Sequence, residues 1–544
     1  MNASIRKAFN LRGLVLHPFL LAMYVVLAPV AENIDIVGLQ AIRSLLVAIA
    51  AVFLISLVLR LILGDPIRAG LLTSGLVLWL GSYGHVAEWL GRWISFPGLS
   101  PVLLILGLGA AAAWGYWVVR RLDDPAPLNT YLNLVSVIAL VFPLWTIVAY
   151  RSVSPQIDQR VEALRQELPL SASDLTAQAS AQDEPHPDIY YVVLDGYARQ
   201  DVLQELYGFD NSPFIDDLRQ LGFYVPGQAQ ANYHETAYSI ASSLNMAHLE
   251  AAPGILLEDV GGSPGAVLRE GLASLIHRST LSGFLRQQGY QVIAFDSGYD
   301  ETAMQDIDEF ARSPEVPRFN ADAAFELMLM DTTVGKFFLE LRGKDFEPLQ
   351  SLFDDHRARV RYGIRELSAY ADQPGPQFVF SHVISPHSPY VFGPNGEPRY
   401  GVDPFTLWGE TAAQEWTPEL YTDQVQYINS LVLAEVREIL ATSEPDPIII
   451  LQADHSSRAW GVPDPEPETH QKLLFPIMLA MYLPPSEGDV QPYETISPVN
   501  IFRLILNAYF GTDLAFLPDT RFTLAETDEG HRFVNACERI GGCP

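Results

Sequence analysis

Five long apolar stretches fill the first 150 residues of this 544-residue chain. Each is close to the ~20 residues that a helix needs to cross the hydrocarbon core of a bilayer. They cover residues 14–31, 39–63, 69–87, 101–119 and 131–150. One such stretch on its own also fits a buried core helix, but five in succession, separated by short charged loops, predict a membrane bundle. We therefore expect residues 1–150 to form a transmembrane domain of five spans.

The basic residues around these stretches predict the orientation of the bundle, because loops on the cytoplasmic side carry an excess of Lys and Arg. With a cytoplasmic N-terminus, seven basic residues fall on the inner side: Arg6, Lys7, Arg12, Arg60, Arg68, Arg120 and Arg121. Three fall on the outer side: Arg43, Arg92 and Arg151. We expect an integral protein of the cell (inner) membrane whose chain after residue 150 is extracytoplasmic.

Charge is distributed unevenly between the two parts. Residues 1–150 hold 9 basic and 6 acidic residues, and the whole chain holds 34 and 64, so the remaining 394 residues carry 25 basic against 58 acidic groups. Such an acidic surface repels the phosphate backbone that dominates nucleic-acid affinity, so no nucleic acid is expected as a partner. An aromatic content of 11% also excludes intrinsic disorder as the general state of the chain.

A connector, residues 151–187, follows the membrane domain. Residues 156–168 (QIDQRVEALRQEL) predict a short amphipathic helix on the membrane surface. Residues 171–187 lack apolar periodicity and predict a linker.

Residues 188–544 predict an α/β domain. Short, continuously apolar runs indicate strands that are buried on both faces, as in a mostly parallel central sheet flanked by helices. Strands are expected at residues 189–194, 291–295, 378–383, 448–451 and 479–483, with helices such as 280–288 and 353–370 between them.

Carboxylates and imidazoles follow these strands. Asp195, Asp296, His387 and the pair Asp454 and His455 each come shortly after a predicted strand. The carboxyl ends of parallel strands meet at one edge, and these side chains are the ligand types of a divalent cation. A helix cap at Asp195 and a solvated turn at Asp454–His455 are the structural alternatives. For Asp296 a structural role is the simpler interpretation.

Thr236 is the candidate nucleophile. It stands where a helix is expected to begin, and a helix N-terminus favours developing negative charge. A threonine hydroxyl is a poor nucleophile unless a metal activates it. On spacing alone, a threonine that merely caps the helix is the favoured interpretation.

Taken in order, these motifs resemble the alkaline phosphatase/sulfatase superfamily. The order is Asp195, then Thr236 within T-x-x-S-x-x-S-S-L, then S-P-H-x-P-Y around His387, then Asp454–His455. Within the superfamily the chain is most similar to membrane-anchored sulfatase-like proteins, which include phosphoethanolamine transferases and lipoteichoic acid synthases. The resemblance implies five spans followed by an alkaline-phosphatase-like extracytoplasmic catalytic domain at residues 188–544.

The resemblance also implies roles for individual residues. One divalent metal ion (Zn, Mn, Mg or Ca) would be bound by four of them: Asp195, Thr236, Asp454 and His455. Thr236 would be the covalent nucleophile, and His387 and His470 match histidines that hold the transferred phosphate or a second metal. His382 has either a similar role or that of a histidine in the last turn of a buried strand.

Three departures from the family patterns bear on the substrate. No C/S-x-P-x-R motif is present, which argues against a formylglycine sulfatase; the two cysteines are Cys537 and Cys543, for which a small disulfide loop is expected. The transferases commonly have Glu where this chain has Asp195, and Gly where it has Ser456.

The expected function is that of a metal-dependent enzyme acting on a phospholipid or another anionic ester at the membrane. It would transfer a phospho-alcohol group from a lipid to an envelope acceptor through Thr236. A phosphate or sulfate ester hydrolase with the same residues is the alternative, and an inactive envelope scaffold is a further one.

Overall fold

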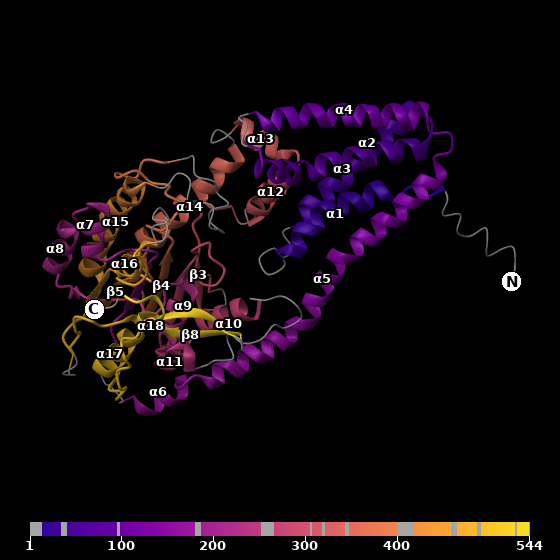
Figure 1. Cartoon of the computed structure of the whole chain (residues 1–544). Coiled ribbons are helices and arrows are strands. Elements are labelled where there is room, and N and C mark those ends of the chain that lie inside the picture. Colours follow the sequence, from indigo (N-terminus) through magenta and orange to yellow (C-terminus); the bar gives the residue numbers. More distant parts are fainter. Residues whose placement is uncertain are drawn as a thin grey trace, which may run out of the picture. The chain divides into compact units, whose positions relative to one another are not determined.

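A computed structural model describes most of the chain, and its residues fall into two compact units (Figure 1). The first unit comprises residues 1–154 and 318–352, and the second comprises residues 155–317 and 353–544. The described residues are 13–33, 41–94, 98–179, 186–251, 266–304, 307–317, 321–342, 347–399, 417–458, 465–486, 491–527 and 530–542.

The first unit is helical. Its helices are α1 (His17–Glu32), α2 (Ala41–Leu63), α3 (Pro66–Gly91), α4 (Leu99–Arg120), the first part of α5 (Ala126–Glu167), α12 (Ala321–Thr332) and α13 (Gly335–Arg342). By length and composition three described helical segments can cross a membrane: Ala41–Leu63, Leu99–Arg120 and Ala126–Tyr150. His17–Glu32 is a shorter apolar helix, and α3 does not meet the same criteria, so three of the five predicted spans are supported on this basis.

Local sequence explains where these helices begin and what they expose. The Asp65 carboxylate accepts hydrogen bonds from the backbone N–H groups of Ile67 and Arg68, and Pro66 stands at the first helical position, so α3 begins there. Large apolar side chains such as Leu61 and Phe142 are more than two-thirds exposed. An apolar outer surface of this kind is expected of helices in contact with lipid.

The connector differs in part from its prediction. The helix predicted over residues 156–168 is present, but it continues α5 without a break to Glu167. The linker predicted over residues 171–187 is wrong where α6 (Ala172–Gln178) forms. A capping box in which Ser171 and Asp174 bond each other's backbone stabilises the start of α6, and the fully buried Leu175 fixes it to the second unit.

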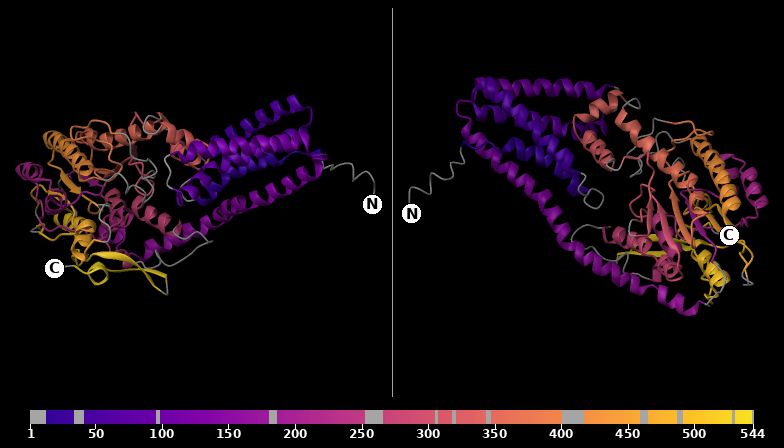
Figure 2. Two further views of the ribbon diagram at one scale, coloured as in Figure 1. Left: turned by 45° about the horizontal axis from the view of Figure 1, so that its top comes forward. Right: turned by 180° about the vertical axis from the view of Figure 1, so that it is seen from behind.

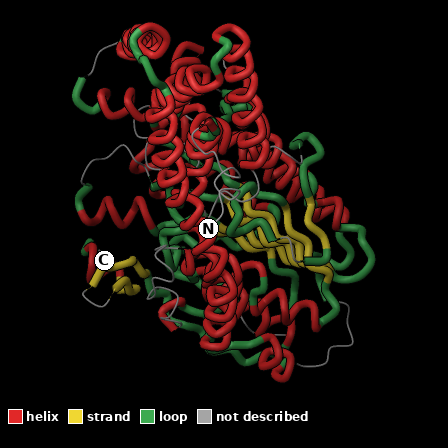
Figure 3. The backbone as a smooth tube through the Cα atoms, turned by 90° about the vertical axis from the view of Figure 1, so that its right-hand side faces the viewer, coloured by secondary structure: helices red, strands yellow, loops and turns green. Residues whose placement is uncertain are grey.

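A six-stranded sheet forms the centre of the second unit (Figure 3). Its order is β3-β2-β4-β1-β5-β6, and all neighbouring pairs are parallel except β5 and β6. The strands are β1 (Ile189–Leu194), β2 (Gln291–Phe295), β3 (Glu309–Ala311), β4 (Gln377–Val383), β5 (Ile448–Gln452) and β6 (Leu479–Tyr482). The five predicted strands are confirmed to within one residue, and β3, only three residues long, is additional.

Helices and a hairpin complete this unit. Its further helices are α7 (Gln200–Tyr207), α8 (Ser212–Gln220), α9 (Thr236–Asn245), α10 (Ala266–His277), α11 (Thr280–Gln287), α14 (Glu347–Arg365), α15 (Pro418–Thr442), α16 (Pro467–Leu474), α17 (Pro498–Phe510) and α18 (Ala536–Ile540), with single 3-10 turns at Leu249–Ala251 and Ser368–Tyr370. The antiparallel pair β7 (Phe522–Thr527) and β8 (Gly530–Asn535) stands apart from the sheet. Cys543 lies outside the described residues, so its disulfide with Cys537 stays a prediction.

The capping box gives a direct test of α6. We expect Asp174→Ala to speed amide hydrogen exchange across residues 172–178 by roughly fivefold, because losing a cap costs about 1 kcal/mol of local stability. Gln178→Ala, an exposed change at the other end of the same helix, is the control and should leave exchange unchanged. Equal exchange in both variants would show that the capping box does not stabilise this helix.

Candidate metal centre

The carboxyl ends of the three central strands bring the predicted polar side chains together. Asp195 directly follows β1, and Asp454 comes two residues after β5. His382 is the penultimate residue of β4, opposite Val193 in the register of β1. Because β4, β1 and β5 are parallel neighbours, their ends deliver these side chains to one edge of the sheet.

Donor atoms of four buried side chains face one another at this edge. His382 Nε2 lies 3.4 Å from Asp195 Oδ2, and His455 Nε2 lies 3.3 Å from Asp195 Oδ1. His455 Nε2 also lies 3.5 Å from Asp454 Oδ2. Two overlapping groups have donor atoms within 4.8 Å of one another: Asp195 with His387 and His455, and Asp195 with His382 and Asp454. The structure therefore assembles five of the predicted site residues in one place.

Four of these atoms have no hydrogen-bond partner among the described residues: Asp195 Oδ1, His382 Nε2, Asp454 Oδ2 and His455 Nε2. Leaving one buried polar group unsatisfied costs about 1–3 kcal/mol, more when it is charged. Carboxylate oxygens and imidazole nitrogens that converge without partners are the donor set of a divalent metal. These residues fit a metal ion on that observation alone.

Backbone contacts fix the orientation of the pair after β5. Asp454 Oδ1 accepts hydrogen bonds from the backbone N–H groups of Gly196 (3.0 Å) and His455 (2.9 Å), which leaves Oδ2 for the site. His455 Nδ1 lies 2.6 Å from the carbonyl oxygen of Ser456. A carbonyl oxygen can only accept, so Nδ1 carries a proton, and a neutral His455 directs the lone pair of Nε2 at the carboxylates, as ligation requires.

The other two histidines are oriented in similar ways. His387 Nδ1 donates to the carbonyl oxygen of Ser388 at 2.7 Å, and the His387 backbone N–H donates to the carbonyl oxygen of Asp195 at 2.9 Å. His382 Nδ1 contacts Thr302 Oγ1 at 2.8 Å, and Thr302 in turn bonds Ser297. Partners of this kind set the tautomer and ring angle of metal-binding histidines.

The histidines at the carboxyl edge of the sheet favour the ionised form of the Asp195 carboxyl group. Burial opposes ionisation of Asp195, but His387, His382 and His455 together hold the pKa of this carboxyl well below its usual range. Burial and the Arg458 guanidinium lower the pKa of His455, and the carboxylates of Asp454 and Asp195 outweigh them, so that its pKa lies above the ordinary value. Without a metal, a proton on Nε2 of His455 can balance these carboxylates, at the atom that would otherwise face the metal.

Thr236 is the first residue of α9 and is half-buried. Its neighbour Glu235 forms an ion pair with Arg458 at 3.0 Å, and His455 is close enough to influence the pKa values of both His234 and Glu235. The N-terminal end of α9 is therefore held towards the segment that carries Asp454 and His455. The roles of Thr236 as nucleophile and ligand stay predictions.

His470 lies on α16, is half-buried, and belongs to neither of the two donor groups. It influences the pKa of His234, which burial first of all lowers to about 4, so it lies on the α9 side of the site. His470 is thus separate from the four donor atoms that lack hydrogen-bond partners.

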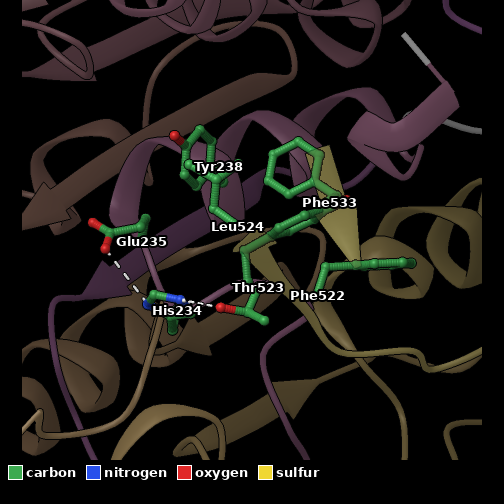
Figure 4. Close-up of a pocket in the computed structure, with 8 residues that line it drawn as sticks. His234, Glu235, Tyr238, Phe522, Thr523, Leu524 and Phe533 are labelled. Carbon is green, nitrogen blue, oxygen red and sulfur yellow. Dashed lines mark hydrogen bonds and ion pairs between the residues drawn. The ribbon is translucent and has the colours of Figure 1, made fainter. Parts of the chain in front are cut away.

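A small cavity of about 100 Å³ lies at the start of α9, against β7 and β8 (Figure 4). It is lined by residues of α9 and β7–β8 and the segment before α9: Tyr233, His234, Glu235, Tyr238, Phe522, Thr523, Leu524 and Phe533. Figure 4 shows His234 between Glu235 and Thr523, with contacts of 3.5 and 3.2 Å. The Tyr238 and Phe533 rings meet edge to face at 5.2 Å. The cavity offers a partly aromatic surface at the first turn of α9, formed by Tyr233, Tyr238, Phe522 and Phe533.

Four residues near the site were not anticipated: Gly196, Thr302, Arg458 and His234. His234 and Gly196 could have been found from the sequence, because they are close to Thr236 and Asp195 in the chain. Gly196 has φ of +69°, and a Cβ there would contact the rings of His387 and His455 at 3.4–3.5 Å. No sequence pattern identifies Thr302 and Arg458, because only folding brings them close to the site.

Comparisons with known proteins give distant structural likenesses. No family model matches the chain, and no curated protein matches it. Among solved structures, the C-terminal periplasmic domain of EcEptC from Escherichia coli, in complex with Zn, is similar with 10% identity and a TM-score of 0.39, over 67% of this chain and 98% of that one.

Two further solved structures are similar over longer stretches of the chain. A protein in the alkaline phosphatase superfamily from Vibrio parahaemolyticus has 12% identity and a TM-score of 0.37, over 70% and 83% of the two chains. The integral membrane protein lipooligosaccharide phosphoethanolamine transferase A from Neisseria meningitidis has 12% identity and a TM-score of 0.31, over 87% and 88%. The superfamily of the Vibrio protein and the transferase class of the Neisseria protein are those that the sequence motifs resemble.

A metal-content measurement tests the site. We expect the purified full-length protein to bind about one equivalent of a divalent cation, and Asp454→Asn to lose it by roughly tenfold or more, because a ligand oxygen is replaced at constant shape. Metal analysis and the rise in Tm on adding the cation report this without any assay of activity.

The matched control is Asp296→Asn, whose carboxylate lies 3.8 Å from Arg359 and belongs to neither donor group. This variant should keep the wild-type metal content. A wild-type protein that neither contains nor takes up a divalent cation would show that the four atoms are balanced by protons.

Proposed function

We propose that this protein is a membrane-anchored, metal-dependent enzyme that transfers a phospho-alcohol group from a lipid to an envelope acceptor. The observation that carries the proposal is the set of four orphaned donor atoms of Asp195, His382, Asp454 and His455 at the carboxyl edge of the parallel sheet. Enzymes of phosphoryl transfer need such a positive centre, because negative charge spreads over the oxygens of the transferred group.

The metal would be held by Asp195, Asp454 and His455 together with Thr236, and His382 and His387 would complete the site or hold the substrate phosphate. When bound, the cation would supply positive charge that stabilises the phosphoryl oxygens and lowers the proton affinity of the attacking hydroxyl. Zn, Mn, Mg and Ca all accept part of this ligand set, and a second ion would use the two overlapping donor groups.

The chemistry proceeds in two displacements. Thr236 Oγ attacks phosphorus, a new P–O bond forms, and the bond from phosphorus to the lipid alcohol breaks. The hydroxyl proton of Thr236 passes to solvent water, and the departing lipid alkoxide takes a proton from the imidazolium form of His387, which then regains one from solvent. In the second step an acceptor hydroxyl attacks the phospho-threonine, the bond to Thr236 Oγ breaks, and Thr236 recovers its proton.

The cavity at the start of α9 would accept the organic part of one substrate. Its aromatic lining contributes apolar contact, while His234 and Thr523 offer polar atoms to a hydroxyl or amine. The Glu235–Arg458 ion pair would hold the start of α9 in place, so that Thr236 stays directed at the site. Arg458 is a positioning residue in this proposal.

The membrane part would give the enzyme access to its lipid. We propose that α1 to α5 are five spans, that the N-terminus is cytoplasmic and that residues 188–544 form the extracytoplasmic catalytic domain of an inner-membrane protein. Three helices of sufficient length and apolarity, and the seven-to-three distribution of basic residues, support this topology.

A hydrolase with the same residues is the second candidate, favoured by the half-buried position of Thr236, which leaves room for water as the acceptor. Product analysis with and without an acceptor glycan or lipid separates the two. A scaffold without activity is the third, and the metal measurement above decides against it if a cation is bound.

Thr236 gives the sharpest test. We expect Thr236→Ala to reduce turnover by roughly a thousandfold or more, since it removes the covalent route, and Thr236→Ser to keep measurable activity because a hydroxyl remains. Mass spectrometry of the wild type after exposure to phospholipid vesicles should show a phospho-alcohol adduct on Thr236. A fully active Thr236→Ala variant with no adduct in the wild type would overturn the mechanism.

The cavity gives a second test. We expect Tyr238→Ala to raise KM by roughly tenfold with less change in kcat, because about 1.4 kcal/mol of contact energy corresponds to a factor of ten in binding. Tyr238→Phe keeps the ring and is the control. If the alanine variant changed neither constant, the cavity would have no part in substrate binding.

A further inference from the structure

The helices α12 and α13 are distant in sequence from the membrane domain, yet they pack into the same compact unit as α1 to α4. Both views in Figure 2 place this helical hairpin at one end of the bundle. It lies between β3 and α14 in the chain, among elements of the α/β domain. We propose that this hairpin is a membrane-inserted anchor and that α13 binds the acyl region of the lipid leaflet through Phe338 and Leu341.

Apolar packing joins the first helix of the hairpin to the bundle. Phe325 of α12 is buried against Val26 and Val30 of α1 and Ala41 of α2. Met328 and Leu329 pack against the same cluster. Phe325 is fully buried and Met328 and Leu329 are half-buried, so this apolar contact holds α12 against α1 and α2.

The second helix is joined to the other pair of membrane helices. Phe337 and Val334 pack on a cluster formed by Tyr83 and Ala87 of α3 and Leu103 of α4. The backbone N–H of Val334 also donates to the carbonyl oxygen of Leu80 at 2.7 Å.

Polar contacts and a close backbone approach make the docking specific. Arg43 of α2 forms a two-pronged ion pair with Glu326 of α12, at 2.7 and 2.6 Å. A Cβ on Gly84 of α3 would lie only 1.9 Å from the carbonyl oxygen of Asp331 and 2.4 Å from the carbonyl carbon of Thr332. Any larger residue at position 84 must therefore displace the hairpin.

These contacts define which end of the bundle the hairpin occupies. They involve the C-terminal halves of α1 and α3 and the N-terminal parts of α2 and α4. In a bundle whose successive helices alternate in direction, these parts lie on the same side of the membrane. That side is opposite the start of α1, as the distribution of basic residues also predicts.

The exposed residues of α13 are the apolar Phe338 and Leu341 and the charged Glu340 and Arg342. Phe338 is 49% exposed and Leu341 is 67% exposed, while Glu340 lies about 160° away from Phe338 around the helix. The neighbouring helix α4 exposes Val102, Ile105 and Leu106, which belong to a segment apolar enough to span a membrane. Because α13 packs on α4 through Phe337 and Leu103, Phe338 and Leu341 would extend the apolar surface of α4 towards lipid, with the charged end of Arg342 at the headgroups.

Depth-dependent quenching in nanodiscs tests the anchor. The environment-sensitive dye NBD is attached to single added cysteines in F338C, L341C and E340C of the full-length chain, with unmodified protein as the labelling blank. In nanodiscs of phosphatidylcholine that contain 5-doxyl lipid, we expect at least twofold stronger quenching at positions 338 and 341 than at 340. Equal, weak quenching at all three positions would overturn the proposal. Quenching at positions 338 and 341 that falls when two copies share a nanodisc would also overturn it, because these residues would then be buried against a second copy.

Two glycine variants of α3 test the docking of the hairpin separately from any structural effect of the dye labels. Gly84→Val should reduce quenching at position 338 at least twofold, because the hairpin cannot dock. Gly91→Val is the matched control, since nothing lies within 4 Å of its Cβ. Unchanged quenching in Gly84→Val with a folded bundle would show that docking at Gly84 does not set the position of α13.

Discussion

The carboxyl edge of the central sheet depends on one electrostatic constraint. Asp195, Asp454 and His455 are buried side by side, and their oxygens and nitrogen stand 3.3–3.5 Å apart without hydrogen bonds among themselves. Such a cluster is stable only when positive charge is present at its centre, whether a proton or a cation. The strand register, the bonds from Gly196 and His455 to Asp454 and the tautomer of His455 all serve to hold these atoms in that arrangement.

The two units differ in where they place apolar and polar side chains. In the first unit, large apolar side chains such as Leu61 face outward, and polar contacts such as Arg43–Glu326 join helices that are distant in sequence. In the second, every residue of β1 and β4 is buried, and polar groups gather where the strands end. A lipid substrate and a phosphoryl-transfer site would make use of both arrangements, each in its own unit.

Much of this organisation could be predicted from the sequence, because it depends on local pattern. Continuous apolar runs identified five strands to within one residue, and strand ends identified Asp195, His387, Asp454 and His455 as a group. What failed depended on tertiary contact: α6 needs Leu175 to pack before its capping box matters, and β3 is too short to show a pattern. Thr302 behind His382 and the hairpin at 321–342 could not be foreseen, since neither carries a local sign of its distant partner.

The position of the hairpin in the chain has a consequence for biogenesis. The membrane helices α1 to α4 are synthesised about 200 residues before α12, and until then the surfaces of Val26, Val30 and Tyr83 that receive it are uncovered. The helical unit is thus completed only after β1 and β2 have left the ribosome and residues 321–342 have been synthesised. Assembly of this protein therefore follows an order set by the sequence, in which a segment made between two elements of the α/β part closes a helical unit that was made earlier.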